Sequence, residues 1–261
     1  ENNVDLNRNF LGENEVYSGA PEHYIRLNPM LNPESPPGFD FFLLRTISSI
    51  LKSGFNALKQ SIVGGQYEYP NGLFFGGNRL EEGPTQYLQW LRDNLSTAEH
   101  IVAIDVHTGL GKQGFDTLLV EGGPENDLYQ QLEVAFGDHV APWDAEDSVA
   151  YEIRGGHGQG IRNCLPDTTV HFVTQEFGTL APLKVLHALR EENRWHHWGP
   201  GNQQTGHTEH SSKQKILGAF RPDLDSWRNA VIKRGRELAK QATQLAFSST
   251  QTQSSPTAPD I

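Results

Sequence analysis

The sequence of 261 residues contains a single cysteine, Cys164, so it forms no internal disulfide and lacks the thiolate pairs of cysteine zinc fingers. It contains no apolar run of transmembrane length and no secretory signal peptide, so we expect no membrane partner and favour a cytoplasmic location. Positive charge is scarce, because 21 Lys and Arg residues face 32 Asp and Glu residues. The net charge of −11 argues against a nucleic-acid partner.

The composition is otherwise that of a globular protein with many defined turns. Hydrophobic residues make up 36% of the chain, and there are 26 Gly and 15 Pro residues. This length and composition predict one domain, which we place at residues 1–247. Residues 248–261 are rich in Ser, Thr, Gln and Pro, which predicts a disordered tail.

The pattern of apolar residues predicts an α/β fold. Residues 101–109 and 168–179 have the pattern of buried strands, each ending at a glycine, and residues 116–120 predict a neighbouring strand. Residues 1–10 predict a short strand or an ordered loop, and residues 11–40 a long surface loop. Helical spacing predicts helices at residues 41–62, 84–95, 125–136, 183–198 and 222–247, with a short helix after Ser212. We expect a mixed, mainly parallel sheet flanked by helices, without the opening strands of its domain.

Two glycine-rich segments interrupt these elements. Residues 64–77 alternate glycine with aromatic residues, which fits either a packed loop or the wall of a pocket. Residues 155–160 read GGHGQG, a spacing that matches neither dinucleotide nor Walker phosphate-binding motifs, and we predict no helix or strand there. Arg154 and His157 in this segment are candidate pocket residues because of its loop character.

Polar residues stand at the carboxyl ends of the two long strands. Asp105 and His107 alternate with apolar residues and so share one face, and Glu176 precedes the glycine that ends the other strand. A histidine there is a competent zinc ligand, and a nearby glutamate can act as a base on metal-bound water. A buried histidine that only satisfies a structural hydrogen bond is the alternative for His107, and a loop or capping hydrogen bond is the alternative for Asp105.

Three strings occur in the order VDLNRNF (residues 4–10), DVHTG (105–109) and TQEFGT (174–179). In these strings the chain resembles the zinc carboxypeptidase superfamily, in particular a carboxypeptidase-like branch related to succinylglutamate desuccinylase and aspartoacylase. The resemblance extends from Glu1 to about Phe247. It implies that Asn7 and Arg8 bind the terminal carboxylate of the substrate, that His107 is a zinc ligand and that Glu176 is the general base.

The implied activity is zinc-dependent hydrolysis of an amide next to a free carboxylate, in a peptide or an N-acyl amino acid. A deacylase of the desuccinylase or aspartoacylase type is one alternative. Arg8 offers a planar fork for bidentate carboxylate binding, and Asp105 is a candidate to orient the histidine ligand from the second shell.

The sequence departs from the resemblance in one respect. The family takes two further zinc ligands from a His-x-x-Glu segment upstream of the Asn-Arg pair, which we expect before residue 1, so the chain resembles the C-terminal portion of a larger, truncated domain. The histidine-rich residues 196–210 lack the spacing of a zinc site. A metal-free, inactive carboxylate-binding module that retains Arg8 is therefore a further alternative.

Overall fold

A computed structural model describes residues 2–42, 44, 46–47, 59–60, 62–142, 153–200 and 210–252 of the protein. The four strands that it describes form one open sheet in the order β1-β4-β2-β3. The pairs β1–β4 and β2–β3 are parallel, and β4–β2 is antiparallel. This confirms the predicted α/β class with a mixed, mainly parallel sheet. The strands are β1 (His100–Gly109), β2 (Asp116–Val120), β3 (Val140–Pro142) and β4 (Thr169–Gly178).

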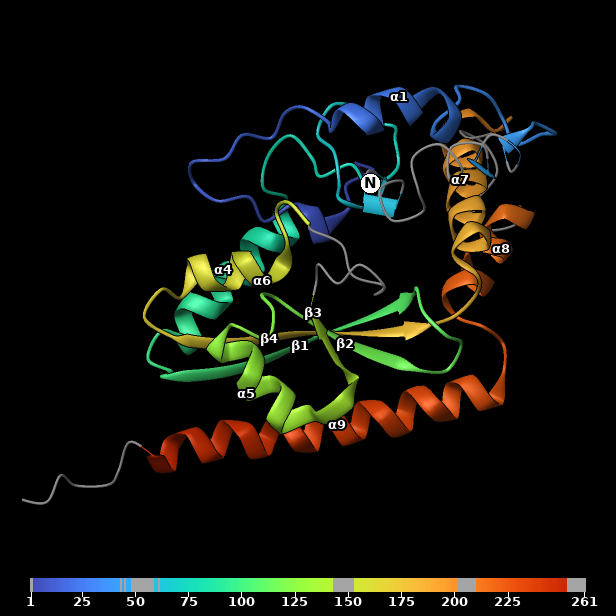
Figure 1. Ribbon diagram of the computed structural model, residues 1–261. Coiled ribbons are helices and arrows are strands. Elements are labelled where there is room, and N and C mark those ends of the chain that lie inside the picture. Colours follow the sequence, from blue (N-terminus) through green and yellow to red (C-terminus); the bar gives the residue numbers. More distant parts are fainter. Residues whose placement is uncertain are drawn as a thin grey trace, which may run out of the picture.

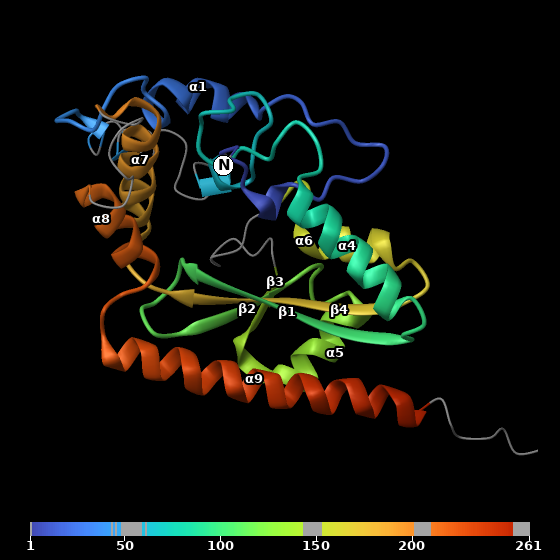
Figure 2. The ribbon, with the colours of Figure 1, turned by 180° about the vertical axis from the view of Figure 1, so that it is seen from behind.

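Helices cover both faces of the sheet. In Figures 1 and 2, α4 (Glu82–Leu95) and α6 (His157–Cys164) lie on one face, and α5 (Asp127–Phe136) and α9 (Asp225–Thr252) lie on the other. A 3-10 turn, η2 (Gly137–His139), links α5 to β3. No helix in the described parts of the chain is long and apolar enough to cross a membrane.

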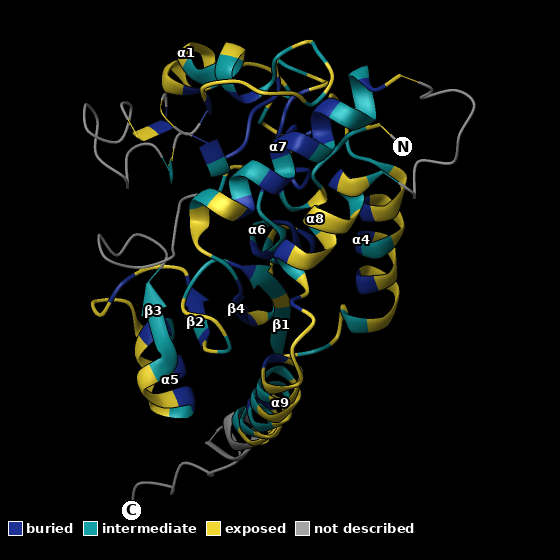
Figure 3. Ribbon diagram, turned by 90° about the vertical axis from the view of Figure 1, so that its right-hand side faces the viewer, coloured by how far each residue is buried: buried dark blue, intermediate teal, exposed yellow. Residues whose placement is uncertain are grey.

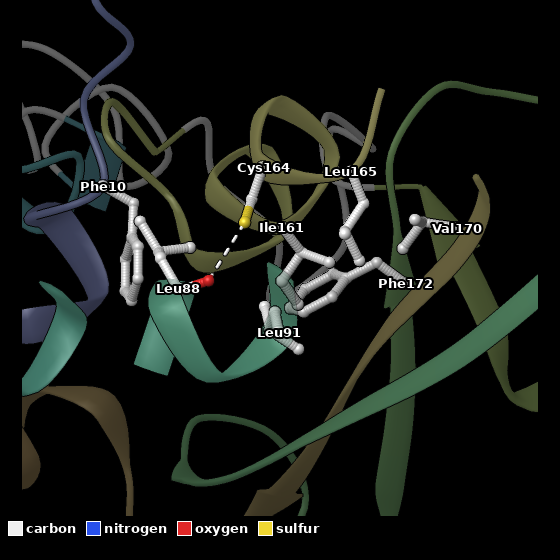
Figure 4. Packing of buried hydrophobic residues seen from close by; sticks show 8 residues of the cluster. All are labelled: Phe10, Leu88, Leu91, Ile161, Cys164, Leu165, Val170 and Phe172. Carbon is white, nitrogen blue, oxygen red and sulfur yellow. Dashed lines mark hydrogen bonds between the residues drawn. The ribbon is translucent and has the colours of Figure 1, made fainter. Parts of the chain in front are cut away.

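Each face of the sheet has its own apolar core, as the alternation of side chains along a strand requires. On the α4 and α6 face, Phe172 of β4 packs with Leu88 and Leu91 of α4 and with Ile161 of α6 (Figure 4). The opposite core is built from β2, β4, α5 and α9 and includes Leu118, Val120, Tyr129, Leu132, Phe136, Val173 and Leu238. Asp105, His107 and Glu176 follow the alternation of the first face.

The N-terminal residues form a further layer over the α4 and α6 side of the sheet (Figure 1). It contains a 3-10 turn, η1 (Leu6–Arg8), and α1 (Glu22–Leu31). Two helices, α7 (Pro182–Trp198) and α8 (Ser211–Phe220), rise from the carboxyl end of β4 beside this layer. The apolar core of the N-terminal layer is formed by Tyr24, Leu31, Phe42 and Ile62.

Two helices occur where the sequence predicted none. The predicted surface loop at residues 11–40 contains α1, because Tyr24 and Leu31 give its short helix one fully buried side despite Pro29 in the last turn. The glycine-rich segment contains α6, whose Ile161 and Cys164 are buried. Burial of one face stabilises a helix that propensity alone disfavours, and this explains both errors.

The strand predictions also need correction in two respects. β1 is a strand as predicted, but its side chains are mostly half-buried rather than buried, because β1 lies at one edge of the four described strands (Figure 3). β2 has the predicted bounds, but β4 separates it from β1. By contrast, β4 is buried over nine of its ten residues.

Some predictions fall partly outside the described residues. Much of the predicted helix at residues 41–62 lies there, although Phe42 and Ile62 are helical and buried. The final helix continues past Phe247 to Thr252, so the start of the predicted disordered tail is helical, and residues 253–261 are outside the described part. Residues 6–8 form η1, which settles the N-terminal alternative against a strand.

Candidate active site at the carboxyl ends of β1 and β4

The candidate site lies where β1 and β4 end side by side. His107 and Glu176 are register partners on these parallel strands, and Nδ1 of His107 lies 3.8 Å from Oε2 of Glu176. Parallel strands deliver polar groups to one edge of the sheet, which is where open α/β sheets bind their ligands. The two strongest sequence candidates are therefore brought together.

Asp105 connects His107 to a second histidine. Oδ2 of Asp105 lies 3.0 Å from Nε2 of His107 and 3.3 Å from Nδ1 of His157. Asp105 therefore contacts the histidine that it was predicted to orient, and its orienting role stays a prediction. Since Nε2 of His107 is engaged by the carboxylate, Nδ1 is the nitrogen that faces Glu176.

Glu176 is an almost fully buried carboxyl group. Its residue is only 6% exposed, and Oε1 accepts a hydrogen bond of 2.9 Å from the backbone N–H of Leu110. Burial raises the pKa of Glu176 to about 7, although the Leu110 hydrogen bond and the neighbouring His107 act in the opposite direction. A carboxyl group with a pKa near neutrality can both accept and return a proton at physiological pH.

The pKa values of Asp105 and His107 shift in opposite directions, and both shifts favour the charged forms that make an ion pair. Burial raises the pKa of Asp105, but hydrogen bonds from His107 and His157 outweigh it and hold the pKa well below its usual range. Burial lowers the pKa of His107, and the hydrogen bond and charge of Asp105, together with Glu176, reverse this effect and raise it. Asp105 therefore remains ionised and holds the imidazole.

A cavity of about 390 Å³ opens beside His107 and Glu176. Its lining is mostly apolar, with Leu183, Leu186 and Leu189 recurring along α7 and Phe220 ending α8. Figure 1 shows the carboxyl end of β4 directed toward the base of these two helices. These lining residues were not predicted from the sequence, although the leucine spacing of three residues along α7 could have indicated them.

A second cavity, of about 520 Å³, is also lined by His107. Its lining is more polar and includes Asp105, His157 and Arg162. Asn7 and His107 line both cavities. Both cavities therefore offer space for a ligand next to the histidine.

Asn7 and Arg8 are brought to the site by η1, whose preceding residue Asp5 accepts a hydrogen bond from the backbone N–H of Asn7. Arg8 lines the 390 Å³ cavity but is only 3% exposed. Its guanidinium contacts Asp5 at 2.8 Å and donates to the Val63 carbonyl at 2.6 Å. A substrate carboxylate at Arg8 has to share the guanidinium with Asp5.

Arg154 lines a different cavity, whereas the aromatic loop reaches the 390 Å³ cavity. Arg154 stacks over Tyr67 at 4.7 Å, donates to the carbonyls of Val16 and Ser18, and lines a separate cavity of about 530 Å³. The aromatic loop serves both predicted purposes, because Tyr67 is buried while Phe74 lines the 390 Å³ cavity.

The histidine-rich segment is used structurally where the structure describes it. His210 stacks on Trp195 at 3.6 Å between ring centroids, and its side chain caps the start of α8. His196 and His197 lie in the last turn of α7, and residues 201–209, which include His207 and Glu209, lie outside the described part of the chain.

The residues of the site fit one ligand of a zinc centre. A histidine that binds a metal through one ring nitrogen commonly donates a hydrogen bond from the N–H of the other nitrogen to a carboxylate. Nε2 of His107 is placed for such a hydrogen bond to Asp105, and Nδ1 then remains available for a metal. Within the described ranges, no group of three or more His, Cys, Asp or Glu side chains is arranged to hold a metal ion. A complete set of three protein ligands is therefore not provided by these ranges.

Residues 1–234 match a family described as "Protein of unknown function (DUF2817)", and because this match spans most of the chain, the protein belongs to that family. Comparisons with curated proteins and with solved structures give no match.

Proposed function

We propose that this protein is a zinc-dependent hydrolase that cleaves an amide bond next to a free carboxylate, in a peptide or an N-acyl amino acid. The proposal is carried by the pairing of Glu176 with His107 at 3.8 Å, beside a ligand-sized cavity at the ends of two parallel strands. It agrees with the resemblance to the zinc carboxypeptidase superfamily that the sequence motifs suggest.

Glu176 is assigned the role of general base. Its carboxylate takes a proton from a water molecule, the water oxygen bonds to the scissile carbonyl carbon, and the proton then passes to the amide nitrogen as the C–N bond breaks. A pKa of about 7, raised by burial, suits a group that accepts a proton and later returns it. Zinc, when bound, supplies polarisation of the carbonyl and acidification of the attacking water.

His107 is assigned as a zinc ligand through Nδ1, with Asp105 holding the opposite nitrogen. A catalytic zinc takes three protein ligands, so two more have to join His107. A second candidate function is a metal-free module that binds carboxylates without cleaving them, and it is supported by Arg8, which lines the 390 Å³ cavity.

The residues that line the 390 Å³ cavity indicate which part of a substrate it would bind. Arg8 and Asn7 are among its polar lining residues and are assigned to the substrate carboxylate, while the leucines of α7 contribute to its apolar lining. The second cavity, which His107 also lines, adds room for the acyl portion, and this extra space supports a peptide more than a small acyl group.

A substrate panel tests the proposal. The protein as its gene encodes it, supplied with zinc, is incubated with peptides and N-acyl amino acids whose terminal carboxyl group is either free or amidated. We expect release of the terminal residue from the free acids only. Binding of the free acids without cleavage would support the binding module, and the absence of both binding and cleavage would contradict both functions.

A further inference from the structure

The glycine-rich motif at residues 155–160 has no place in the proposed reaction, yet it carries a histidine to the site. His157 is the first residue of α6, and its Nδ1 lies 3.3 Å from Oδ2 of Asp105. The same oxygen lies 3.0 Å from Nε2 of His107. One carboxylate oxygen is thus held between two imidazole rings.

The glycines of the motif allow α6 to approach closely enough for this contact. A Cβ atom at Gly158 would lie 2.7 Å from the ring of Phe172, and one at Gly160 would lie 2.6 Å from the ring of Phe10. Any larger residue at either position would push the helix away from β4 or from the N-terminal segment. The glycines lower the intrinsic helix propensity of this segment, and the same glycines allow α6 to pack closely against the sheet.

Aromatic rings fix the orientation of His157. Its imidazole stacks on Phe10 with 5.0 Å between centroids, and it meets Tyr87 and Phe172 edge-on at 5.1 and 5.6 Å. Rings on several sides restrict rotation of the imidazole, so Nδ1 stays directed at Asp105.

We propose that His157 is a positioning residue, which fixes the Asp105 carboxylate and through it the tautomer and orientation of His107. When the imidazole of His107 is neutral, Nδ1–H of His157 and Nε2–H of His107 both donate to Oδ2, so His107 keeps its Nδ1 lone pair directed toward Glu176. The importance of this arrangement for turnover rests on the function proposed above, whereas the tautomer itself does not.

Nitrogen NMR of the imidazole rings tests the proposal on uniformly ¹⁵N-labelled protein without metal, at a pH high enough that the imidazole of His107 is neutral, with the His107 signals assigned by their loss in His107→Gln. His157→Phe preserves the aromatic packing and removes the hydrogen bond. We expect His107 to be the Nε2–H tautomer in the wild type and a mixture of tautomers in His157→Phe. His157→Asn places an amide nitrogen near the position of Nδ1, and we expect it to restore the wild-type tautomer.

An unchanged His107 tautomer in His157→Phe would overturn the proposal, whatever the hydrolysis assay shows. A changed tautomer in a protein whose wild type cleaves no substrate would leave the positioning role intact and contradict the proposed function. If His157→Phe does not fold, His157→Gln replaces it, because its amide nitrogen lies one bond further along the side chain. We then expect His157→Asn, and not His157→Gln, to keep the wild-type tautomer.

Discussion

At the scale of single residues, the pKa values of two carboxyl groups beside His107 shift in opposite directions. Burial raises the pKa of Glu176 to about 7, whereas hydrogen bonds from two histidines outweigh burial and lower the pKa of Asp105. A pair of carboxyl groups separated in this way is typical of sites where one group exchanges protons and the other orients a partner. Accordingly, Glu176 is proposed to exchange protons and Asp105 to orient His107.

The orienting role of Asp105 predicts the behaviour of Asp105→Asn. An uncharged amide holds Nε2 of His107 less firmly, so we expect zinc or Co²⁺ affinity to fall by about 10- to 100-fold, as is usual when the partner of a ligating histidine is lost. Titration of the metal-free protein measures this change. Asp138→Asn, at an exposed residue of η2, is the matched control and should leave the affinity unchanged. Equal metal affinity in Asp105→Asn and Asp138→Asn would show that Asp105 does not orient the ligating histidine.

Arg8 gives a second prediction at this scale. Arg8→Lys keeps the positive charge but loses the planar fork that engages a carboxylate through two parallel hydrogen bonds. We expect KM for substrates with a free carboxylate to rise by about tenfold, with little change for amidated substrates. Steady-state kinetics on matched free and amidated substrates measure the difference. A rise that is equal for both substrates would mean that Arg8 acts only through its structural contacts with Asp5 and Val63.

At the scale of elements, α7 is held to the N-terminal layer by two buried arginines. Arg190 donates to the carbonyl of Met30 at 2.8 Å, and Arg194 donates to the carbonyl of Ser35 at 3.0 Å. Both also contact Asp40, at 2.5 and 3.1 Å. Because the leucines that line the cavity stand on α7, this cluster fixes one wall of the site.

The cluster predicts a loss of stability in acid. Burial raises the pKa of Asp40, but the hydrogen bond and charge of Arg190, with Arg194, hold it below the ordinary value of 3.8. A lowered pKa in the folded state means that the stabilisation is complete above that ordinary value and is lost as pH falls through the lowered value. Urea unfolding at pH 7 and pH 3 should show this loss in the wild type and a smaller one in Asp40→Asn.

At pH 7 we expect Asp40→Asn to cost on the order of 1–2 kcal/mol, less than for a fully buried pair because Asp40 is partly exposed. Asp223→Asn is the control, since Asp223 also pairs with an arginine but its side chain is 97% exposed. We expect almost no change in the free energy of unfolding for that variant. Equal costs in the two variants would show that the cluster does not anchor α7.

The elements also show what the sequence could predict. β1, β2 and β4 were predicted because β-branched and apolar runs near glycines are local patterns, and β2 was placed at its observed bounds, whereas the three-residue strand β3 was not predicted. The helices α1 and α6 were missed because their stability depends on buried contacts with distant segments, such as that of Gly160 with Phe10. Local propensity contains no information on those contacts.

At the scale of the whole molecule, the site is assembled from widely separated parts of the chain. Arg8 comes from η1, His107 from β1, His157 from α6 and Glu176 from β4, while α7 and α8 enclose the cavity. The motifs identified Arg8, His107 and Glu176 because each stands in a distinctive string. The link from His157 through Asp105 was not predictable, since it depends on how α6 packs against the sheet.

The activity of Glu176→Gln tests the central claim most directly. Gln keeps the size of the side chain and can still accept the hydrogen bond from Leu110, but it cannot take a proton from water. With the protein as its gene encodes it and equal zinc content confirmed in both samples, we predict that the rate of amide cleavage falls by at least about 10³-fold. The matched control, Glu133→Gln on the exposed side of α5, should cleave at the wild-type rate. Cleavage by Glu176→Gln at the wild-type rate would contradict the assignment of this carboxylate as the base.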